Sequence, residues 1–240
     1  MVAFSGPDPI GVLIGAKRPS GTLVHKIAVH PDHRRQGHGR HLLASLGSKL
    51  AILGPPRIVA EVPENLAAAH GLFNASGYVE EAVLTDYVLR SEDNRGTRPE
   101  LGPHFVIPVT VDDLAANDLL EDAHPQLCWE RSVQTLTARK NEITGLAVAS
   151  DERIEAYVLY VTSGVGAERN AEAQIVSLRT FVEDGAARLK QLLARLRATG
   201  MRTFRFPKVH AVEMSEECLE RLGFHPTGGH RLYAASARSE

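Results

Sequence analysis

The chain has 240 residues, with 27 basic and 29 acidic side chains and a formal net charge of −2. Hydrophobic residues make up 43% and charged residues 23%, the profile of a globular protein with its own core. The near-neutral charge gives no case for nucleic-acid binding. Cys128 and Cys218 form no CxxC pair, which argues against a disulfide scaffold or a cysteine zinc site. No apolar run approaches the roughly 20 residues that span a bilayer, and the first residues lack signal-peptide order, so we expect a cytoplasmic protein without a membrane partner.

The first ninety residues alternate strands with helices. Apolar and β-branched runs predict strands over residues 2–4, 10–16, 23–29, 57–62 and 79–90. Leucines at three- and four-residue spacing predict a helix that ends near Leu53, before Gly54. A second helix over residues 64–75 ends at Gly77, a typical C-cap.

The second half repeats this order behind an extra front end. We expect strands over residues 104–110, 143–149, 154–161, 173–181 and 202–206, and a last strand that ends near 235. Helices are predicted over residues 111–120, 128–140 and 185–198, with another that Ser215 caps. The helix of each half that follows the loop region ends in a glycine and an aromatic residue, as Gly77-Tyr78 and Gly223-Phe224, which indicates an internal duplication.

A polar stretch over residues 91–103, rich in glycine and proline, separates the halves. We therefore expect a first unit over residues 1–92, a linker over 93–103 and a second unit over 104–240. The fold class is α/β, with each unit a mixed, mostly antiparallel sheet flanked by helices.

The most informative segment is a basic loop between a strand and a helix, Arg34-Arg35-Gln36-Gly37-His38-Gly39-Arg40. Its glycines allow a tight turn and close approach of a ligand to the backbone. The first amides of a helix lack internal partners, and the helix dipole adds positive potential there. The arginines can fork onto phosphate oxygens. The segment predicts a pyrophosphate site; the alternative is a solvated basic turn.

Two familiar phosphate loops are absent, because the sequence contains neither GxxxxGK[ST] nor GxGxxG. The segment instead resembles the acetyl-CoA signature of the GNAT acetyltransferase superfamily, R/Q-x-x-G-x-G/A after a strand that ends in V-x-P-x. Arg34, Gly37 and Gly39 fall on the three defining positions. The next helix, which ends in Gly77-Tyr78, is similar to the following segment of that family. The resemblance covers residues 1–90 well and the second half only in its order of elements.

The resemblance implies a fold, a co-substrate and site residues. It implies two GNAT-like units, the first without the usual front strand and two helices. The loop amides would hold the pyrophosphate of acetyl-CoA, and one amide of the preceding strand, at Val29, would polarise the thioester carbonyl. The residues implied for acetyl-CoA are Ile27, Ala28, Val29, Arg34, Arg35, Gln36, Gly37, His38, Gly39, Arg40, Asn65 and Phe73.

Three features depart from the family pattern. The position where the family often has a glutamate base is His25, which is competent near neutral pH; a strand histidine without a role is the alternative, and Glu61 and Asp86 are weaker candidate bases. The position of the family's tyrosine acid is Phe73, which has no proton to give and would pack against the pantetheine. Because the front elements are absent, the second half, the linker or another subunit must wall the acceptor site.

The second half departs differently. Its loop carries Glu183 and Asp184 where the first has arginines, and two carboxylates would repel a pyrophosphate by of order 1 kcal/mol or more each. The tyrosine position is Leu219. We therefore expect a degenerate unit that has lost CoA binding and serves to shape the acceptor site.

Other groups of residues are weaker signals. The histidines at 25, 30, 33, 38 and 41 lack a completing ligand at metal spacing, so we predict no metal site. Trp129 and Cys128 are expected in core or interface, with a place in the acceptor cleft as the alternative.

Together these features predict an N-acetyltransferase that moves an acetyl group from acetyl-CoA to a primary amine of a small molecule or peptide. Tandem members of the family that acylate an amino-sugar thiol precursor are one possibility. The alternative function is a non-catalytic acyl-CoA-binding sensor or interaction protein. The chain is expected to act as a monomer or a homodimer, the latter if two copies complete each acceptor site.

Overall fold

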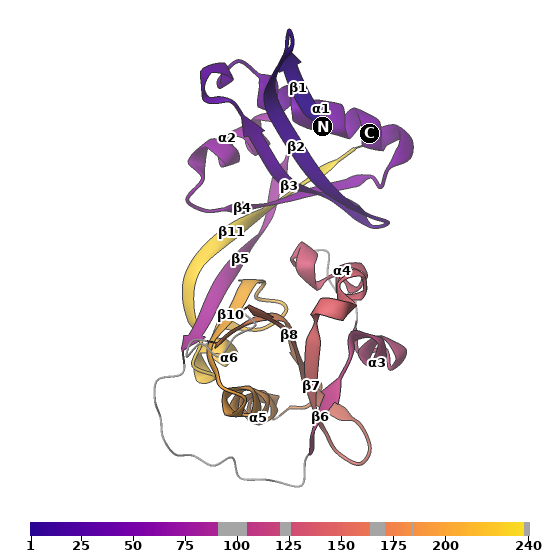
Figure 1. The fold of residues 1–240 in the computed structure, drawn as a ribbon, viewed down its shortest axis with the longest axis vertical. Coiled ribbons are helices and arrows are strands. Elements are labelled where there is room, and N and C mark those ends of the chain that lie inside the picture. Colours follow the sequence, from indigo (N-terminus) through magenta and orange to yellow (C-terminus); the bar gives the residue numbers. More distant parts are fainter. Residues whose placement is uncertain (91–104, 121–125, 164–170, 184, 238–240) are drawn as a thin grey trace. The chain divides into compact units, whose positions relative to one another are not determined.

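The computed structural model describes residues 1–90, 105–120, 126–163, 171–183 and 185–237 (Figure 1). The chain forms two compact units, unit 1 with residues 1–83 and 229–240 and unit 2 with residues 84–228. Both combine strands and helices in an α/β fold with a mixed sheet. Within the described ranges, every helix is too short or too polar to span a bilayer.

The sheet of unit 1 has the strand order β1-β2-β3-β4-β11, and β5 and β11 each have residues in both units. The strands that have residues in unit 1 are β1 (Val2–Ser5), β2 (Asp8–Arg18), β3 (Gly21–Val29), β4 (Arg57–Pro63), β5 (Val79–Arg90) and β11 (His225–Ser236). Its helices are α1 (His38–Leu53) and α2 (Ala67–Ala75).

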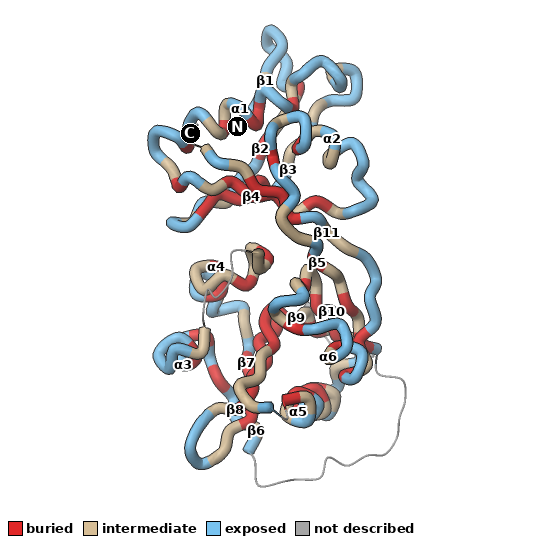
Figure 2. The backbone as a smooth tube through the Cα atoms, turned by 180° about the vertical axis from the view of Figure 1, so that it is seen from behind, coloured by how far each residue is buried: buried red, intermediate tan, exposed pale blue. Residues whose placement is uncertain are grey.

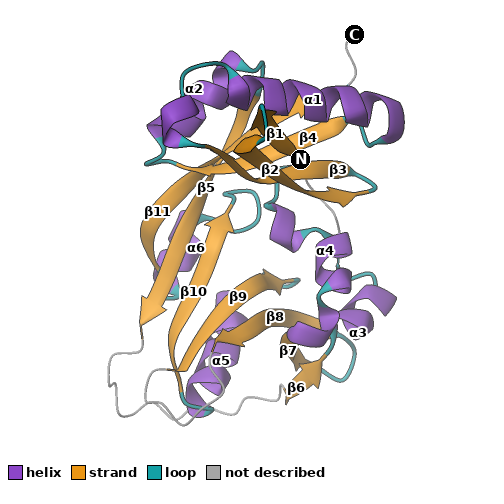
Figure 3. Ribbon diagram, turned by 45° about the horizontal axis from the view of Figure 1, so that its top comes forward, coloured by secondary structure: helices purple, strands orange, loops and turns teal. Residues whose placement is uncertain are grey.

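The two helices of unit 1 cover one face of its sheet (Figure 3). The leucine stripe of α1, spaced by three and four residues, is buried, and β4 is buried over most of its length (Figure 2). These side chains form one apolar cluster with Val24, Phe73 and Tyr233. The cluster fixes where α1 begins relative to the end of β3.

Unit 2 has the strand order β5-β10-β9-β8-β7-β6. Its remaining strands are β6 (Phe105–Val109), β7 (Thr144–Ala149), β8 (Ile154–Ser163), β9 (Ala171–Thr180) and β10 (Met201–Val209). Its helices are α3 (Val111–Ala116), α4 (Val133–Ala138), α5 (Gly185–Ala198) and α6 (Glu216–Arg221), with 3-10 turns η2 (Trp129–Arg131) and η3 (Lys140–Glu142).

Each unit contains one parallel strand pair joined by a helix, β3 and β4 through α1, and β9 and β10 through α5. The register of each pair stops part-way. β3 and β4 pair only at Thr22 with Ile58 and Leu23 with Val59, although β3 continues to Val29. β9 and β10 likewise pair over their first halves only. The same separation of strands in both units agrees with an internal duplication.

The expected unit boundaries at 92 and 104 differ from those of the structure. Residues 229–240 belong to unit 1, because β11 pairs antiparallel with β4 from Pro63 to Arg57 and places Tyr233 in that unit's core. Residues 84–90 belong to unit 2, where they pair with β10. The expected linker over 93–103 lies outside the described residues.

The helix expected over residues 128–140 is wrong. The segment forms η2, then α4, then η3, because Ser132 adopts an extended backbone and caps α4 with its hydroxyl. Three β-branched residues in the α4 segment, Val133, Thr135 and Thr137, weaken any longer helix.

Candidate functional site

The basic loop of unit 1 is held in place by its own backbone and side chains. The amide of His30 donates to the carbonyl of Ile10 at 2.8 Å, which fastens the end of β3 to β2. A single 3-10 turn, η1 (Pro31–His33), follows. The Arg34 Nε donates back to the Val29 carbonyl at 3.1 Å, and Gln36 Nε2 donates to the Asp32 carbonyl at 3.1 Å. The loop is therefore ordered before any ligand arrives.

The backbone of this loop presents a run of free amides. Arg35 and Gly37 have φ of 63° and 88°, left-handed values that turn the chain sharply into α1. Gly37 is the N-cap of the 16-residue helix and supplies no side-chain cap. Among the described residues, no acceptor lies within hydrogen-bond reach of the amides of residues 35–40. Successive free amides at a helix start form an anion-binding site.

The side chains around these amides are positive and leave space for a ligand. Arg35 and Arg40 are exposed and make no ion pair with any described residue. A Cβ added at Gly37 would meet no atom within 4 Å, so the loop has open space in front of it. A Cβ at Gly39 would lie 3.1 Å from Leu72, so this glycine allows the close packing of α1 on α2.

The opening between β3 and β4 adjoins this loop along the chain. Ile14 pairs with Lys26 and Gly15 with Val24, so His25 is the extra residue of a β-bulge in β3. The His25 side chain is exposed. Beyond Leu23 the two parallel strands make no further register pairs. The last residues of β3 therefore border an opening and are not paired with β4.

A groove of about 500 Å³ continues from Gly37 along the side of α1. Its floor includes the Tyr78 ring, whose buried hydroxyl has no hydrogen-bond partner among the described residues. Burial raises the pKa of Tyr78 to about 12, so its hydroxyl stays a donor at all physiological pH values. The groove is lined by Gly37, Arg40, His41, Leu43, Ala44, Gly47, Ile58, Ala75, Ser76, Tyr78, Ala235 and Ser236.

Phe73 lies in the core and not at the surface of this groove. Its side chain is 3% exposed, stacks on Tyr233 with ring centroids 5.7 Å apart, and meets the edge of Tyr78. The Tyr233 hydroxyl bonds His70 Nδ1 at 3.0 Å. Phe73 thus packs the core, and the expected contact with pantetheine has almost no exposed ring surface to support it.

The other predicted residues are spread around the opening. Ile27 packs against the core and Val29 is half-buried, whereas Ala28 and Asn65 are exposed. Glu61 is half-buried on β4.

Asp86, the other candidate base, has a structural role in unit 2. Its carboxylate accepts the Lys208 amide at 2.8 Å, in a bulge where Lys208 has a φ of 55°.

The start of α5 in unit 2, which corresponds to the start of α1 in unit 1, has no open space in front of it. It packs directly on Thr180, since a Cβ added at Gly185 would clash with that side chain. The Thr180 hydroxyl donates to the Glu155 carbonyl at 3.2 Å and accepts the Val182 amide. Glu183 is exposed, and Asp184 lies outside the described residues. The start of α5 therefore lacks the open space found at Gly37.

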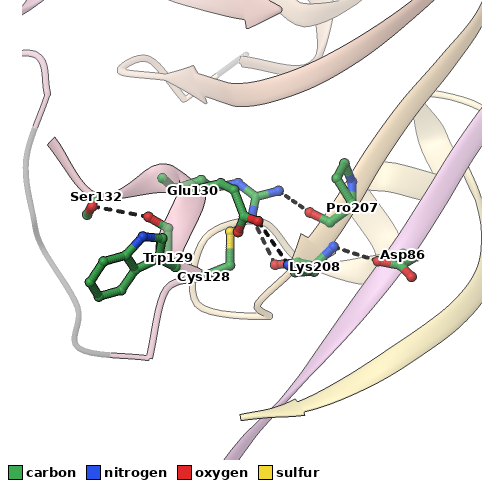
Figure 4. A network of polar contacts seen from close by, with 8 residues as sticks. Asp86, Cys128, Trp129, Glu130, Ser132, Pro207 and Lys208 are labelled. Atoms are coloured by element: carbon green, nitrogen blue, oxygen red, sulfur yellow. Dashed lines mark hydrogen bonds and ion pairs between the residues drawn. The ribbon is translucent and has the colours of Figure 1, made fainter. Parts of the chain in front are cut away.

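A buried polar network occupies unit 2 near η2 (Figure 4). The Arg131 guanidinium, 4% exposed, donates to the Lys208 and Pro207 carbonyls and pairs with Glu213 at 2.7 Å. Burial disfavours the Glu130 carboxylate, but the charge and hydrogen bond of the Lys208 ammonium 3.0 Å away, together with a backbone hydrogen bond and the charge of Arg131, lower its pKa overall.

Cys128 and Trp129 were expected in the core or an interface, and Cys128 lies in the core. Its thiol is buried beside Arg131, whereas Trp129 is half-buried.

Residues 1–80 match the family model described as the GNAT acetyltransferase domain. This match covers the open loop, α1 and α2. Residues 1–80 therefore form a GNAT-like domain, and the chain as a whole has the fold of tandem GNAT proteins.

Solved structures extend the GNAT likeness to the full chain. A tandem GNAT protein from the clavulanic acid biosynthesis pathway matches with a TM-score of 0.65 and 18% identity, over 100% of this chain and 82% of that one. A GCN5-related N-acetyltransferase from Sphaerobacter thermophilus matches with a TM-score of 0.65 and 14% identity, over 97% and 78%. The glucosamine N-acetyltransferase region of a fungal multi-domain β-N-acetylglucosaminidase gives a TM-score of 0.72 at 12% identity, over 96% and 32%.

Sequence reasoning identified the GNAT loop and missed the groove beside it. A signal was present, because the small residues Ala44 and Gly47 of α1 continue the three- and four-residue spacing that begins at Gly37 and Arg40. The part contributed by Ala235 and Ser236 had no local signal, because they reach unit 1 only through pairing of β11 with β4.

Proposed function

We propose that unit 1 is an acetyl-CoA-dependent N-acetyltransferase that acts on a primary amine of a small molecule or peptide. The observation that supports this most is the run of acceptor-free amides over residues 35–40, open to solvent at Gly37 and flanked by Arg35 and Arg40. The amides and arginines fit a pyrophosphate. We further propose a cytoplasmic protein that acts as a monomer or a homodimer.

The groove beside α1 fits the nucleotide end of acetyl-CoA. Its volume, about 500 Å³, lies in the range of small-molecule sites. Arg40 and His41 at its rim would face phosphate oxygens, and the unpartnered Tyr78 hydroxyl supplies a donor. The pantetheine arm would then run from Gly37 along the free edge of β3, past Ile27, Ala28 and Val29.

The reaction needs two functions from this chain, a base and a donor to the developing oxyanion. A base takes the proton from the ammonium of the acceptor, and the amine nitrogen then attacks the thioester carbonyl carbon. The new C–N bond forms and the C–S bond breaks; the nitrogen gives up its second proton to water, and the departing thiolate takes a proton from water. The Val29 amide is proposed to donate to the carbonyl oxygen as charge develops on it. A thiol with a pKa near 8.5 leaves without a strong acid, so Phe73 is compatible with turnover.

His25 is the proposed base, because it is an exposed bulge residue of β3 that lies two positions beyond Leu23, the last residue of β3 to pair with β4. We expect His25→Ala to lower kcat by about 100-fold or more and to leave the KM for acetyl-CoA within about threefold. His225→Ala, at an exposed position in unit 2, is the matched control and keeps full activity. Full activity in His25→Ala together with a loss in Glu61→Gln would transfer the role to Glu61.

A non-catalytic acyl-CoA sensor is the second candidate, and the burial of Phe73 at the position of the family's tyrosine favours it. A panel of primary amines, including glucosamine, amino acids and lysine peptides, separates the two. Free thiol released from acetyl-CoA in proportion to one amine supports the transferase. Tight binding of acetyl-CoA without thiol release from any amine supports the sensor.

A further inference from the structure

Unit 2 contains a small cavity that the proposed acetyl-CoA site does not use. Its volume is about 80 Å³. Tyr157 and Ser177 line one side, from neighbouring strands β8 and β9, and Arg179 extends the same side. Arg131 and Glu213 line another. All of these residues belong to unit 2, and the remaining lining is apolar, with exposed Val212 at the rim.

The carboxylate of Glu213 has only half of its hydrogen-bonding capacity filled. Its side chain is 7% exposed, and one oxygen lies 2.7 Å from Arg131 Nε. The other oxygen, Oε2, is buried and has no partner among the described residues. An unpaired buried carboxylate oxygen costs of order 1–3 kcal/mol, so this position calls for a donor.

Other residues of the lining offer donors. The Arg179 guanidinium makes no ion pair within the described part of the chain and lies 5.9 Å from the centroid of the Phe181 ring. The Tyr157 hydroxyl and the Ser177 hydroxyl are 3.2 Å apart. The lining carries two guanidinium groups against one carboxylate, a net positive charge that favours an anion. A ligand that fits this cavity therefore carries an anionic group for the arginine and hydroxyl donors and a hydrogen-bond donor for Glu213.

We propose that this cavity binds a small carboxylate that also carries a hydrogen-bond donor, an amino or hydroxy acid of the size of glycine or glycolate. The carboxylate lies against Arg179 and the Tyr157 and Ser177 hydroxyls, and the amino or hydroxyl group donates to Glu213 Oε2. A volume of about 80 Å³ equals two to three waters and suits a molecule of about five non-hydrogen atoms. The site gives the degenerate unit a ligand of its own, separate from acetyl-CoA.

The test is saturation-transfer NMR on the full chain with four probes of similar size: glycine, glycolate, acetate and ethanolamine. We expect saturable binding of glycine or glycolate, acetate at least tenfold weaker, and no binding of ethanolamine. Arg179→Gln removes the binding, whereas Arg153→Gln, at an exposed position in the β7–β8 turn, preserves it. Gly37→Glu also preserves it, because that change lies in the acetyl-CoA loop of unit 1.

Three results overturn the proposal. Absence of saturable binding for all four probes means that the cavity holds only water. Binding that persists in an Arg179→Gln variant with a wild-type circular dichroism spectrum places the probe elsewhere. Equal affinity for acetate and glycolate removes the role given to Glu213 Oε2. Because none of these readouts involves acetyl-CoA, failure here is distinct from failure of the acetyltransferase proposal.

Discussion

Gly37→Glu is expected to weaken acetyl-CoA binding by at least about 100-fold, which corresponds to about 2.7 kcal/mol. The new side chain fills the open space before the loop and brings a negative charge against the pyrophosphate. It also strains a backbone position with a φ of 88° and disturbs the amides that follow. Equilibrium dialysis with acetyl-CoA measures the change.

Two variants separate charge from strain. Gly37→Ala carries the same backbone strain without the charge and should lose less than about tenfold in affinity. Gly6→Glu adds the same charge at another left-handed glycine, with a φ of 59° and open space around it, in the β1–β2 turn. Its affinity should match that of the wild type. Equal affinity of Gly37→Glu and the wild type would place the anion site elsewhere.

Arg131→Met should reduce the free energy of unfolding by about 3–5 kcal/mol at neutral pH, because the buried Glu213 carboxylate loses its ion-pair partner. The variant also leaves the Pro207 and Lys208 carbonyls without their donor. Urea unfolding followed by fluorescence of Trp129, the single tryptophan and a neighbour of Arg131 in the chain, measures the loss.

Controls and pH test the cause. Arg139→Met removes an exposed ion pair with Glu142 and should cost less than 1 kcal/mol in the free energy of unfolding.

Burial raises the pKa of Glu213 above its unfolded value, and loss of Arg131 raises this pKa further. A carboxyl with a raised folded-state pKa stabilises the fold in its protonated form, at low pH, and loses this as pH rises through that pKa. The deficit of Arg131→Met should therefore shrink as the pH falls towards 5; a deficit under 1 kcal/mol at neutral pH contradicts this role.

The anion loop and α1 could be predicted from sequence because their signals are local. The loop glycines and arginines lie within seven residues, and the leucine stripe of α1 repeats along one helix. The bulge at His25 was not predicted, since it depends on the register between two strands. The sequence could therefore name His25 as a candidate base, but it could not show that His25 lies in a bulge.

The division into units could not be predicted, because it depends on long-range pairing. Tyr233 of β11 pairs with Ala60 of β4, far earlier in the chain, and through this pairing the last strand joins the first unit. Arg131 was also missed. Its burial depends on carbonyls of the β10 bulge at Pro207 and Lys208, which no pattern near Arg131 reveals.

Calorimetric titration of the wild-type chain with acetyl-CoA tests the central claim most directly, since it counts sites. The open loop at Gly37 and the start of α5 packed on Thr180 together predict one molecule bound per chain. Two molecules per chain would contradict the lack of open space assigned to the start of α5. Absence of binding would contradict the acetyl-CoA site assigned to unit 1.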